Sequence, residues 1–452
     1  MKFSFSENCL AWLESILSQR LGLSCSLSHN GGIIILELEG LEGRIEFDQL
    51  QDYFLDPKSE LPCSFWDPQE ESWQSVLGDP IPCPGVSKLP FPLIEKKEDC
   101  HLIHYDVLGL IYWSLNRIEE IGSRDLDEHQ RFPASSSHAF RNGYLERPIV
   151  DEWIHIMGQV IQRQWPDQKI KLPTTELSVT CDVDYPFRFL FSWLGITKMF
   201  LGDFFKRFNP ILAVKNLSLG LRSRFGYHKQ DPFFYNIDWM MKVAEKNKCR
   251  MTFYFMAGGV HRLDGDALLD YPPVRSLLRE ICKRGHKIGL HPSYLTFSDS
   301  KMLKQESKKM LDVFKEENIR LEVFGSRQHF LRWKTPETAE NLALNKIDQD
   351  SSLGYADHVG FRSGTCFQYP MFNPITDRRI NLLQIPLVLM DVSVIDSKYM
   401  NLDGNLECKK KVTSLLRKIN LLGGNCSVLW HNSAIAEQDH YNLFESIFSE
   451  LN

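Results

Sequence analysis

The sequence lacks three features that would narrow its class at once. No two of its eleven cysteines are spaced as Cys-x-x-Cys, which argues against a zinc ribbon or a thioredoxin-like redox site. No run of 18 apolar residues occurs, so no spanning helix is expected. The first 23 residues have no basic segment before an apolar core, and Glu7 and Glu14 interrupt the candidate core. We therefore expect no signal peptide, a cytoplasmic location and reduced, buried cysteines.

A strong excess of one charge sign is also missing. The net charge is only -6, with 24% charged and 43% hydrophobic residues, as in ordinary globular proteins. Such a mild charge argues neither for nor against nucleic acid as a partner. The sequence also contains no internal repeat and no low-complexity tract.

Two different patterns divide the chain near residue 170. Residues 1–170 combine strand-like pieces with helical patterns at 101–121 and 149–165, which predict a smaller α+β domain of unknown role. In residues 171–452, about seven short apolar strands alternate with amphipathic helices. This alternation calls for a parallel sheet, open or closed into a barrel. The segment "NLLQIPLVLMD" (381–391) is expected to be one of these strands.

Polar side chains follow the predicted strands at the point where each strand ends. The carboxyl ends of parallel strands meet at one pole, which is where active sites of such folds lie. One strand-end residue alone is more often a turn former, but five strands contribute here. The residues are Asp182, Asp184, His291, Arg327, Gln328, His329, Asp350, His431 and Asn432.

The pair Asp182 and Asp184 carries the most chemical information. Residues two apart on a strand face the same way, and two neighbouring carboxylates repel. A divalent metal would take one of them as a ligand and leave the other free as a base, a layout suited to hydrolysis. His431 could then serve as the general acid.

Four segments resemble the motifs of the NodB-like polysaccharide deacetylases, carbohydrate esterase family 4. They are "LSVTCDVDYP", "RGHKIGLHPSY", "FGSRQHF" and "VLWHNS", in the family's order and strand positions. The resemblance spans residues 171–452, and residues 1–170 resemble the N-terminal extension of an uncharacterised branch. It implies an irregular (β/α)7 barrel that removes acetyl groups from N-acetylated sugars with a bound zinc or similar ion. It also implies a base (Asp182), a first metal ligand (Asp184), a second ligand (His291), a residue that steadies the base (Arg327) and an acid (His431).

One position departs from the family pattern. Where the family has its second ligand histidine, four residues after His291, this chain has Leu295, which cannot bind a metal. His286 is no replacement, because residues five apart on a strand point to opposite faces. We expect His286 to support the site from a surrounding shell or to cap the preceding helix.

His329 is the preferred third ligand. It lies two residues after Arg327 and therefore on the same strand face. Together with Asp184 and His291 it would form a three-ligand site with open positions, as catalytic zinc needs. Three alternatives remain open for this ligand: His261, His358 and the carboxylate of Asp182.

Three functions from different classes fit these residues. The first is a metal-dependent hydrolase that removes an N-acetyl group from a glycan or glycan precursor. The second is a carbohydrate-binding relative that has lost its metal and its activity. The third is a metal hydrolase for another C–N bond, such as a ureido or amide group. Retention of an acid, a base and a metal ligand together disfavours the second.

The segment 187–229, which follows Asp184, is basic and aromatic. It has one acidic residue, Asp203, eight Phe residues and one Trp, Trp193. One interpretation is a pair of barrel-covering helices with a solvated basic face. The other is a pair of helices beside the mouth that bind a membrane surface or a lipid- or nucleotide-linked sugar. DNA and RNA are disfavoured as partners because no nucleic-acid motif accompanies the stretch. Its eight basic residues are Lys198, Lys206, Lys215, Lys229, Arg188, Arg207, Arg222 and Arg224.

Overall fold

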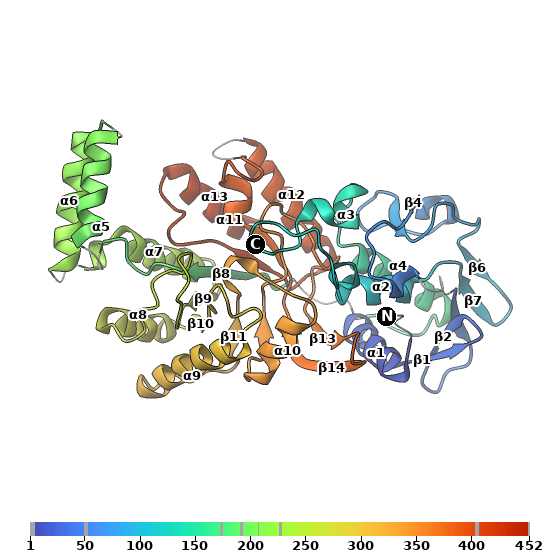
Figure 1. Cartoon of the computed structure of the whole chain (residues 1–452). Coiled ribbons are helices and arrows are strands. Elements are labelled where there is room, and N and C mark those ends of the chain that lie inside the picture. Colours follow the sequence, from blue (N-terminus) through green and yellow to red (C-terminus); the bar gives the residue numbers. More distant parts are fainter. Residues whose placement is uncertain are drawn as a thin grey trace.

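The first 170 residues form a sheet of their own, seen at the right of Figure 1. The computed structural model of the chain describes residues 5–48, 53–171, 175–189, 193–206, 208–225, 228–402 and 406–450. The sheet order is β1 (Cys25–Asn30), β2 (Ile33–Leu38), β3 (Arg44–Asp48), β7 (Cys100–Ile103) and β6 (Ile94–Lys96). A separate hairpin pairs β4 (Cys63–Trp66) with β5 (Ile81–Pro84). The accompanying helices are α1 (Glu7–Leu21), α2 (Val107–Leu115), α3 (His138–Arg141) and α4 (Ile149–Gln164).

The helix expected over residues 101–121 is wrong at both ends, since α2 covers only Val107–Leu115. Residues 101–103 belong to β7, and α2 begins only at Val107. Asp106 sets this boundary, because its side chain accepts a hydrogen bond from the amide of Gly109 at 2.7 Å and so caps the helix. A buried strand and a buried helix are both apolar, so periodicity does not separate them here.

Beyond the linker, the described residues contain a curled nine-stranded sheet that is parallel except at one edge. In spatial order its strands are β13 (Tyr369–Asn373), β14 (Arg378–Gln384), β12 (Gln349–Asp350), β11 (Gly325–Ser326), β10 (Lys287–Leu290), β9 (Met251–Phe255), β8 (Ser178–Val183), β16 (Ser427–Leu429) and β15 (Leu387–Met390). The mixed α/β class and the parallel sheet expected from the alternating pattern are thus confirmed.

The segment 381–391 is two strands rather than one. Its first half lies in β14 beside β12, while its second half is β15 beside β16, at the opposite end of the sheet order. The chain changes partner at Ile385 and Pro386. Proline has no amide hydrogen to give to a ladder, so it interrupts the strand. One bent segment therefore runs from β14, next to one edge of the curled sheet, to β15 at the other edge. Pattern alone predicted a single straight strand.

Helices follow the strands as the alternating pattern predicts. The C-cap region of α8 ends at Gly285, whose φ of +83° is left-handed, a conformation that glycine adopts without strain. The helices are α7 (Pro232–Lys246), α8 (Pro272–Lys283), α9 (Ser300–Glu316), α10 (Glu337–Leu344), α11 (Asp391–Ile395), α12 (Leu406–Leu422) and α13 (Gln438–Ser449).

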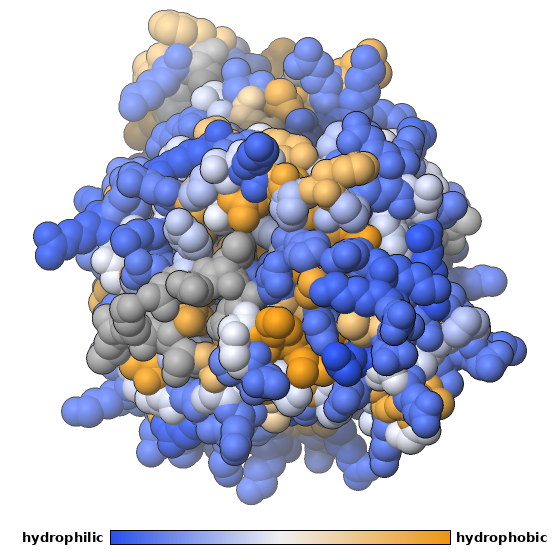
Figure 2. All heavy atoms as spheres, turned by 90° about the vertical axis from the view of Figure 1, so that its right-hand side faces the viewer, coloured by the Kyte–Doolittle hydropathy of each residue, from blue (hydrophilic) through white to orange (hydrophobic). Residues whose placement is uncertain are grey.

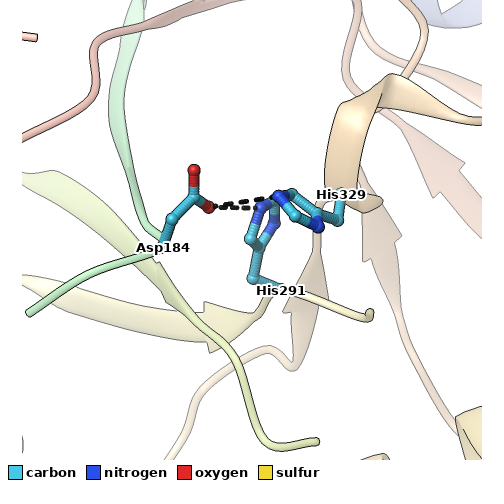
Figure 3. Close-up of side chains that lie close together, drawn as sticks. All are labelled: Asp184, His291 and His329. Carbon is cyan, nitrogen blue, oxygen red and sulfur yellow. Dashed lines mark ion pairs between the residues drawn. The ribbon is translucent and has the colours of Figure 1, made fainter. Parts of the chain in front are cut away.

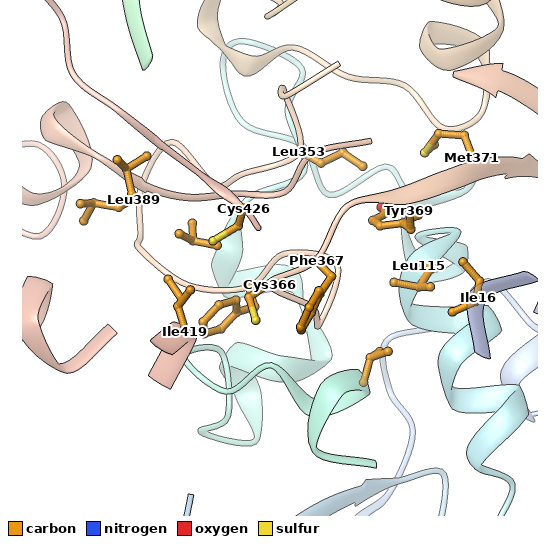
Figure 4. Close-up of a cluster of buried hydrophobic side chains, with 14 of the residues drawn as sticks. Ile16, Leu115, Leu353, Cys366, Phe367, Tyr369, Met371, Leu389, Ile419 and Cys426 are labelled. Carbon is orange, nitrogen blue, oxygen red and sulfur yellow. The ribbon is translucent and has the colours of Figure 1, made fainter. Parts of the chain in front are cut away.

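One hydrophobic core runs through both parts of the chain. Figure 4 shows Ile16 and Leu115 of the first part beside Tyr369 of the second, all of them buried. The indole of Trp12 also donates a hydrogen bond to the carbonyl of Pro370 at 2.8 Å. The two sheets are therefore held together by buried contacts.

The outer face of the N-terminal part is mostly hydrophilic, and its hydrophobic residues lie in small separate patches (Figure 2).

All eleven cysteines are free thiols, and seven of them are buried. Burial in apolar surroundings raises the pKa of the Cys181 and Cys426 thiols, so these groups stay protonated.

The basic aromatic segment forms a helical hairpin that projects from the molecule. Its helices are α5 (Trp193–Leu201) and α6 (Pro210–Arg224), joined by a π-helical turn at Gly202–Lys206. The expectation of helices is confirmed, but the expectation that they pack beside the barrel mouth is wrong. Figure 1 shows the pair standing clear of the curled sheet at the far left, packed against each other. Among the described helices, none is long and apolar enough to cross a membrane. Arg207 lies outside the described residues.

Candidate metal centre

Strand register brings the candidate residues to one level. The parallel ladders align Val183 with Phe255, Phe255 with Leu290, and Leu290 with Ser326. The residues that come directly after three of these strands therefore emerge side by side at the carboxyl pole. They are Asp184, His291 and Arg327.

Asp184, His291 and His329 converge on one point (Figure 3). Oδ1 of Asp184 lies 3.1 Å from Nε2 of His291 and 3.7 Å from Nε2 of His329. One potential ligand atom from each residue lies within 4.8 Å of the others. Around a tetrahedral zinc with bonds of 2.0–2.1 Å, neighbouring ligand atoms are about 3.3 Å apart. These three residues, chosen from the sequence as the ligand set, form a candidate metal site.

Hydrogen bonding orients His291 for coordination. Its Nδ1 lies 2.5 Å from the carbonyl oxygen of Arg327, a contact in which the ring nitrogen must donate. The neutral ring then carries its lone pair on Nε2, the atom that faces Asp184. Fixing a ligand histidine through its second nitrogen is typical of metal sites.

Asp264 faces Nδ1 of His329 as an ion-pair partner rather than through a hydrogen bond, and sequence reasoning missed it. Its Oδ1 lies 3.5 Å from Nδ1 of His329 and accepts the amide of Tyr294 at 2.7 Å. Its Oδ2 accepts the amide of His261 at 2.8 Å. The carboxylate is thus held by the backbone on the far side of the imidazole from Asp184. No sequence signal marks it, because it lies in the irregular loop after β9.

Two buried polar atoms of this site lack hydrogen-bond partners, and a bound cation would satisfy them. Oδ1 of Asp184 and Nε2 of His291 are buried without a hydrogen-bond partner, and each such atom costs free energy. Burial raises the pKa of Asp184, but the imidazoles of His291 and His329 more than offset it and hold the pKa well below its usual value. Burial lowers the pKa of His291, but the carboxylates of Asp182 and Asp184 reverse this and raise it. A divalent cation would replace that proton and satisfy both orphaned atoms.

Asp182 lies next to the three candidate ligands but is not one of them. The residue is 2% exposed, and its Oδ2 lies 3.9 Å from Nε2 of His291. Its Oδ1 has no hydrogen-bond partner. A carboxylate held near a cation site with a free oxygen can accept a proton, as the sequence interpretation requires.

Arg327 is fully buried and donates to hydroxyl groups. Its guanidinium reaches Ser351 Oγ at 2.8 and 3.0 Å and Thr180 Oγ1 at 3.0 Å. Nη1 has no hydrogen-bond partner, and within the described part of the chain no ion pair joins Arg327 to Asp182. That Arg327 steadies the base stays a prediction.

His431 forms a pair with Asp391, a residue that the sequence interpretation did not select. Nδ1 of His431 lies 2.8 Å from Oδ1 of Asp391, and the His431 amide donates to Oδ2 at 2.6 Å. Burial lowers the pKa of His431, but the charge of Asp391 outweighs it and raises the pKa to about 10. His431 is therefore protonated at neutral pH. A signal was present, since Asp391 directly follows the apolar strand β15.

The alternative third ligands lie elsewhere. His261 stacks on the ring of Tyr294 with centroids 4.3 Å apart, and His358 pairs with Asp357 at 3.1 Å. Neither belongs to the metal group found among the described residues.

His286 does not support the site from a surrounding shell. It precedes β10 at the opposite pole of the sheet, where its Nδ1 accepts the amide of Met251 at the start of β9. Of its two expected roles, support near the metal is therefore wrong. Its amide does donate to the carbonyl of Ile281 at 3.1 Å and so caps the end of α8. Its exclusion as a ligand agrees with the structure. Asp350 is likewise structural, since it accepts hydrogen bonds from Ser326 and Ser352.

The N-terminal part reaches the rim of the site. Arg131 donates to the carbonyl of Phe330, the residue after the candidate ligand His329, at 3.0 Å. Arg332 in turn donates to the carbonyl of His129 at 2.8 Å. Phe330 has a φ of +60°, which is strained for a residue with a side chain, so these contacts hold an unusual turn in place.

Known proteins resemble this chain only weakly in sequence and in structure. Residues 11–166 match the model of a family of unknown function, DUF7033. No curated protein matches the sequence. A crystal structure of a proposed polysaccharide deacetylase from Mycobacterium smegmatis is similar over 63% of this chain and 85% of its own, with 16% identity and a TM-score of 0.39. The Puue allantoinase structure is similar over 60% of this chain and 82% of its own, with 13% identity and a TM-score of 0.36.

Proposed function

We propose that the protein is a metal-dependent hydrolase with a NodB-type barrel that removes an acetyl group from an N-acetylated sugar. The observation that supports it most is the convergence of Asp184, His291 and His329 beside a free carboxylate, Asp182, and a protonated imidazole, His431. The sugar substrate rests on the motif resemblance. A lipid- or nucleotide-linked precursor is the proposed form of that sugar.

The proposed ligands are Asp184 and the Nε2 atoms of His291 and His329. Two imidazoles and one carboxylate favour zinc, and they leave positions open for water and substrate. When bound, such an ion supplies Lewis acidity toward a carbonyl oxygen and lowers the pKa of water.

The remaining residues would move protons. Asp182 accepts a proton from the attacking water through its unpartnered Oδ1. His431, held as imidazolium by Asp391, donates its Nε2 proton to the departing amine nitrogen. An amide needs this step, because an unprotonated amine anion is a poor leaving group. Arg327 is proposed to steady Asp182, the role that the motif resemblance implies for it.

Acetate release tests the chemistry. Zinc-loaded protein is incubated with N-acetylglucosamine oligomers, and acetate is measured by a coupled assay. We expect Asp182→Asn to lower turnover by about 10²–10⁴-fold, the usual loss for a general base, with unchanged zinc content. The matched control is Asp348→Asn, whose exposed side chain caps the amide of Phe324 away from the site.

Two results would contradict the proposal. Protein that binds no divalent ion would point to a non-catalytic carbohydrate-binding relative. A metal-loaded protein that releases ammonia from ureido compounds, but no acetate from N-acetylated sugars, would be a hydrolase for a different C–N bond.

A further inference from the structure

The turn of the α5–α6 hairpin exposes large apolar side chains. Phe208 and Ile211 are 84% and 81% exposed, and Phe205 is 63% exposed. Leu201, Phe204 and Val214, also exposed, complete what we name the apolar tip. All six residues lie in or next to the turn between α5 and α6. The hairpin that carries this turn projects from the rest of the molecule (Figure 1). Exposed apolar groups concentrated in this way indicate a surface that meets a partner.

Hydrogen bonds hold the turn that carries the apolar tip in a defined conformation. The carboxylate of Asp203 is buried and accepts a hydrogen bond from Asn216 Nδ2 at 2.7 Å. The amide of Asn209 donates to the Asp203 carbonyl at 2.9 Å, and the Asn209 side chain caps α6 through the amide of Leu212. These bonds fix the turn, so its phenylalanines are presented outward by a folded element.

Basic side chains surround the apolar tip. Lys198 precedes Leu201 by three residues, about 4.5 Å along α5. Lys215 follows Ile211 by four residues, about 6 Å along α6, and directly follows Val214 at the edge of the tip. Both are exposed, as is Lys206 within the turn. The single acidic residue of 187–229, Asp203, is the buried one, so no exposed carboxylate of this segment offsets the positive charge.

Asp231 anchors the base of the hairpin. Its buried carboxylate accepts hydrogen bonds from the amides of Arg188 and Phe189, in the segment that leads into the hairpin, at 2.8 and 2.9 Å. It also accepts the Ser223 hydroxyl near the end of α6 at 3.3 Å and caps α7 through the amide of Phe233. Both stems are thus tied to the start of a helix of the main body, which holds the tip away from it.

We propose that this hairpin docks on the surface of an anionic lipid bilayer, with the apolar tip inserted and the flanking lysines among the phosphates. Amphipathic elements insert about 5–10 Å, a depth that would bring Lys198 and Lys215 to the headgroups. A bilayer satisfies both the apolar tip and the positive charge. A second copy does not, because symmetric pairing of two hairpins would oppose like charges. The proposal is independent of the hydrolytic chemistry.

Vesicle co-sedimentation of the full-length protein tests it. The probes are phosphatidylcholine vesicles with and without phosphatidylglycerol, at low and high salt. We expect binding to the anionic vesicles at low salt and release as salt screens the charges. Phe205→Ser with Phe208→Ser should weaken binding at least about tenfold by removing buried apolar area. Lys198→Ser with Lys215→Ser should weaken it about fivefold per residue.

Matched double variants control for general changes in the surface. Phe65→Ser with Phe91→Ser removes exposed phenylalanines of the N-terminal part. Lys301→Ser with Lys304→Ser removes exposed lysines of α9. Both should bind like the unchanged protein.

Three outcomes would overturn the proposal. These are no binding to anionic vesicles at low salt, equal binding by the tip variants and the controls, or self-association in sedimentation velocity that the tip variants abolish. The last outcome would assign the tip to a second copy of the chain. Circular dichroism should show that all variants keep their helices, because every altered side chain is exposed.

Discussion

The main expected effect of Asp391→Asn is a lower pKa of His431. The pKa of His431 is raised from 6.5 to about 10, which corresponds to roughly 5 kcal/mol in favour of the imidazolium at about 1.4 kcal/mol per unit. Burial opposes this shift, and Asp391 at 2.8 Å is the largest favourable contributor. Removing its charge while keeping its shape should lower the pKa of His431 by at least about two units.

The sign of the stability effect follows from linkage. Because the folded-state pKa of His431 lies above its unfolded value, its contribution to stability is complete below pH 6.5 and is lost as pH rises toward 10. The free energy of unfolding of the unchanged protein should therefore fall across this range. In Asp391→Asn most of this pH dependence of the free energy of unfolding should vanish. Urea unfolding of both proteins at pH 6, 7.5 and 9 measures it.

Nuclear magnetic resonance of metal-free protein gives the direct measurement. Histidine labelled at Cε1 is titrated, and the signal of His431 is assigned by its loss in His431→Gln. The Asp348→Asn control should leave the midpoint unchanged. A wild-type midpoint near 6.5, or a midpoint that Asp391→Asn does not lower, would refute the reasoning. In the active enzyme, the alkaline limb of kcat/KM should move to lower pH in the same variant.

Two further predictions concern the metal and the core. Asp264→Asn should weaken zinc binding about 10–100-fold in calorimetry, because it removes the partner of His329 Nδ1; His329→Ala should weaken it further, and His286→Gln, at the opposite pole, should leave it unchanged. An equal loss in the His286 variant would contradict this site. Ile16→Ala should lower the free energy of unfolding by about 2–5 kcal/mol, since the side chain is buried beside Tyr369. One shared transition is expected in urea, and separate unfolding of the two parts would contradict the continuous core.

The sequence by itself determined the alternating strands and helices and the metal group. A strand that ends in Asp-x-Asp places both carboxylates at the carboxyl pole whatever surrounds it, because side-chain direction on a strand depends on local geometry. The same rule placed His291 and excluded His286. His329 was chosen correctly, but the reason given for it was wrong. The strand β11 ends at Ser326 and His329 begins a 3-10 turn, so His329 and Arg327 do not share a strand face.

Tertiary structure alone decided what depends on contacts between distant segments. Asp264 lies in an irregular loop, and only folding brings it to His329. The division of 381–391 between two ends of the sheet depends on which strands are free to accept each half. The hairpin shows the same limit. Its composition predicted helices with a basic, apolar character. The sequence alone does not show whether an apolar side chain in such a helix will be buried or exposed. Only the fold shows that Phe208 and Ile211 face outward, because their exposure depends on where the rest of the chain packs.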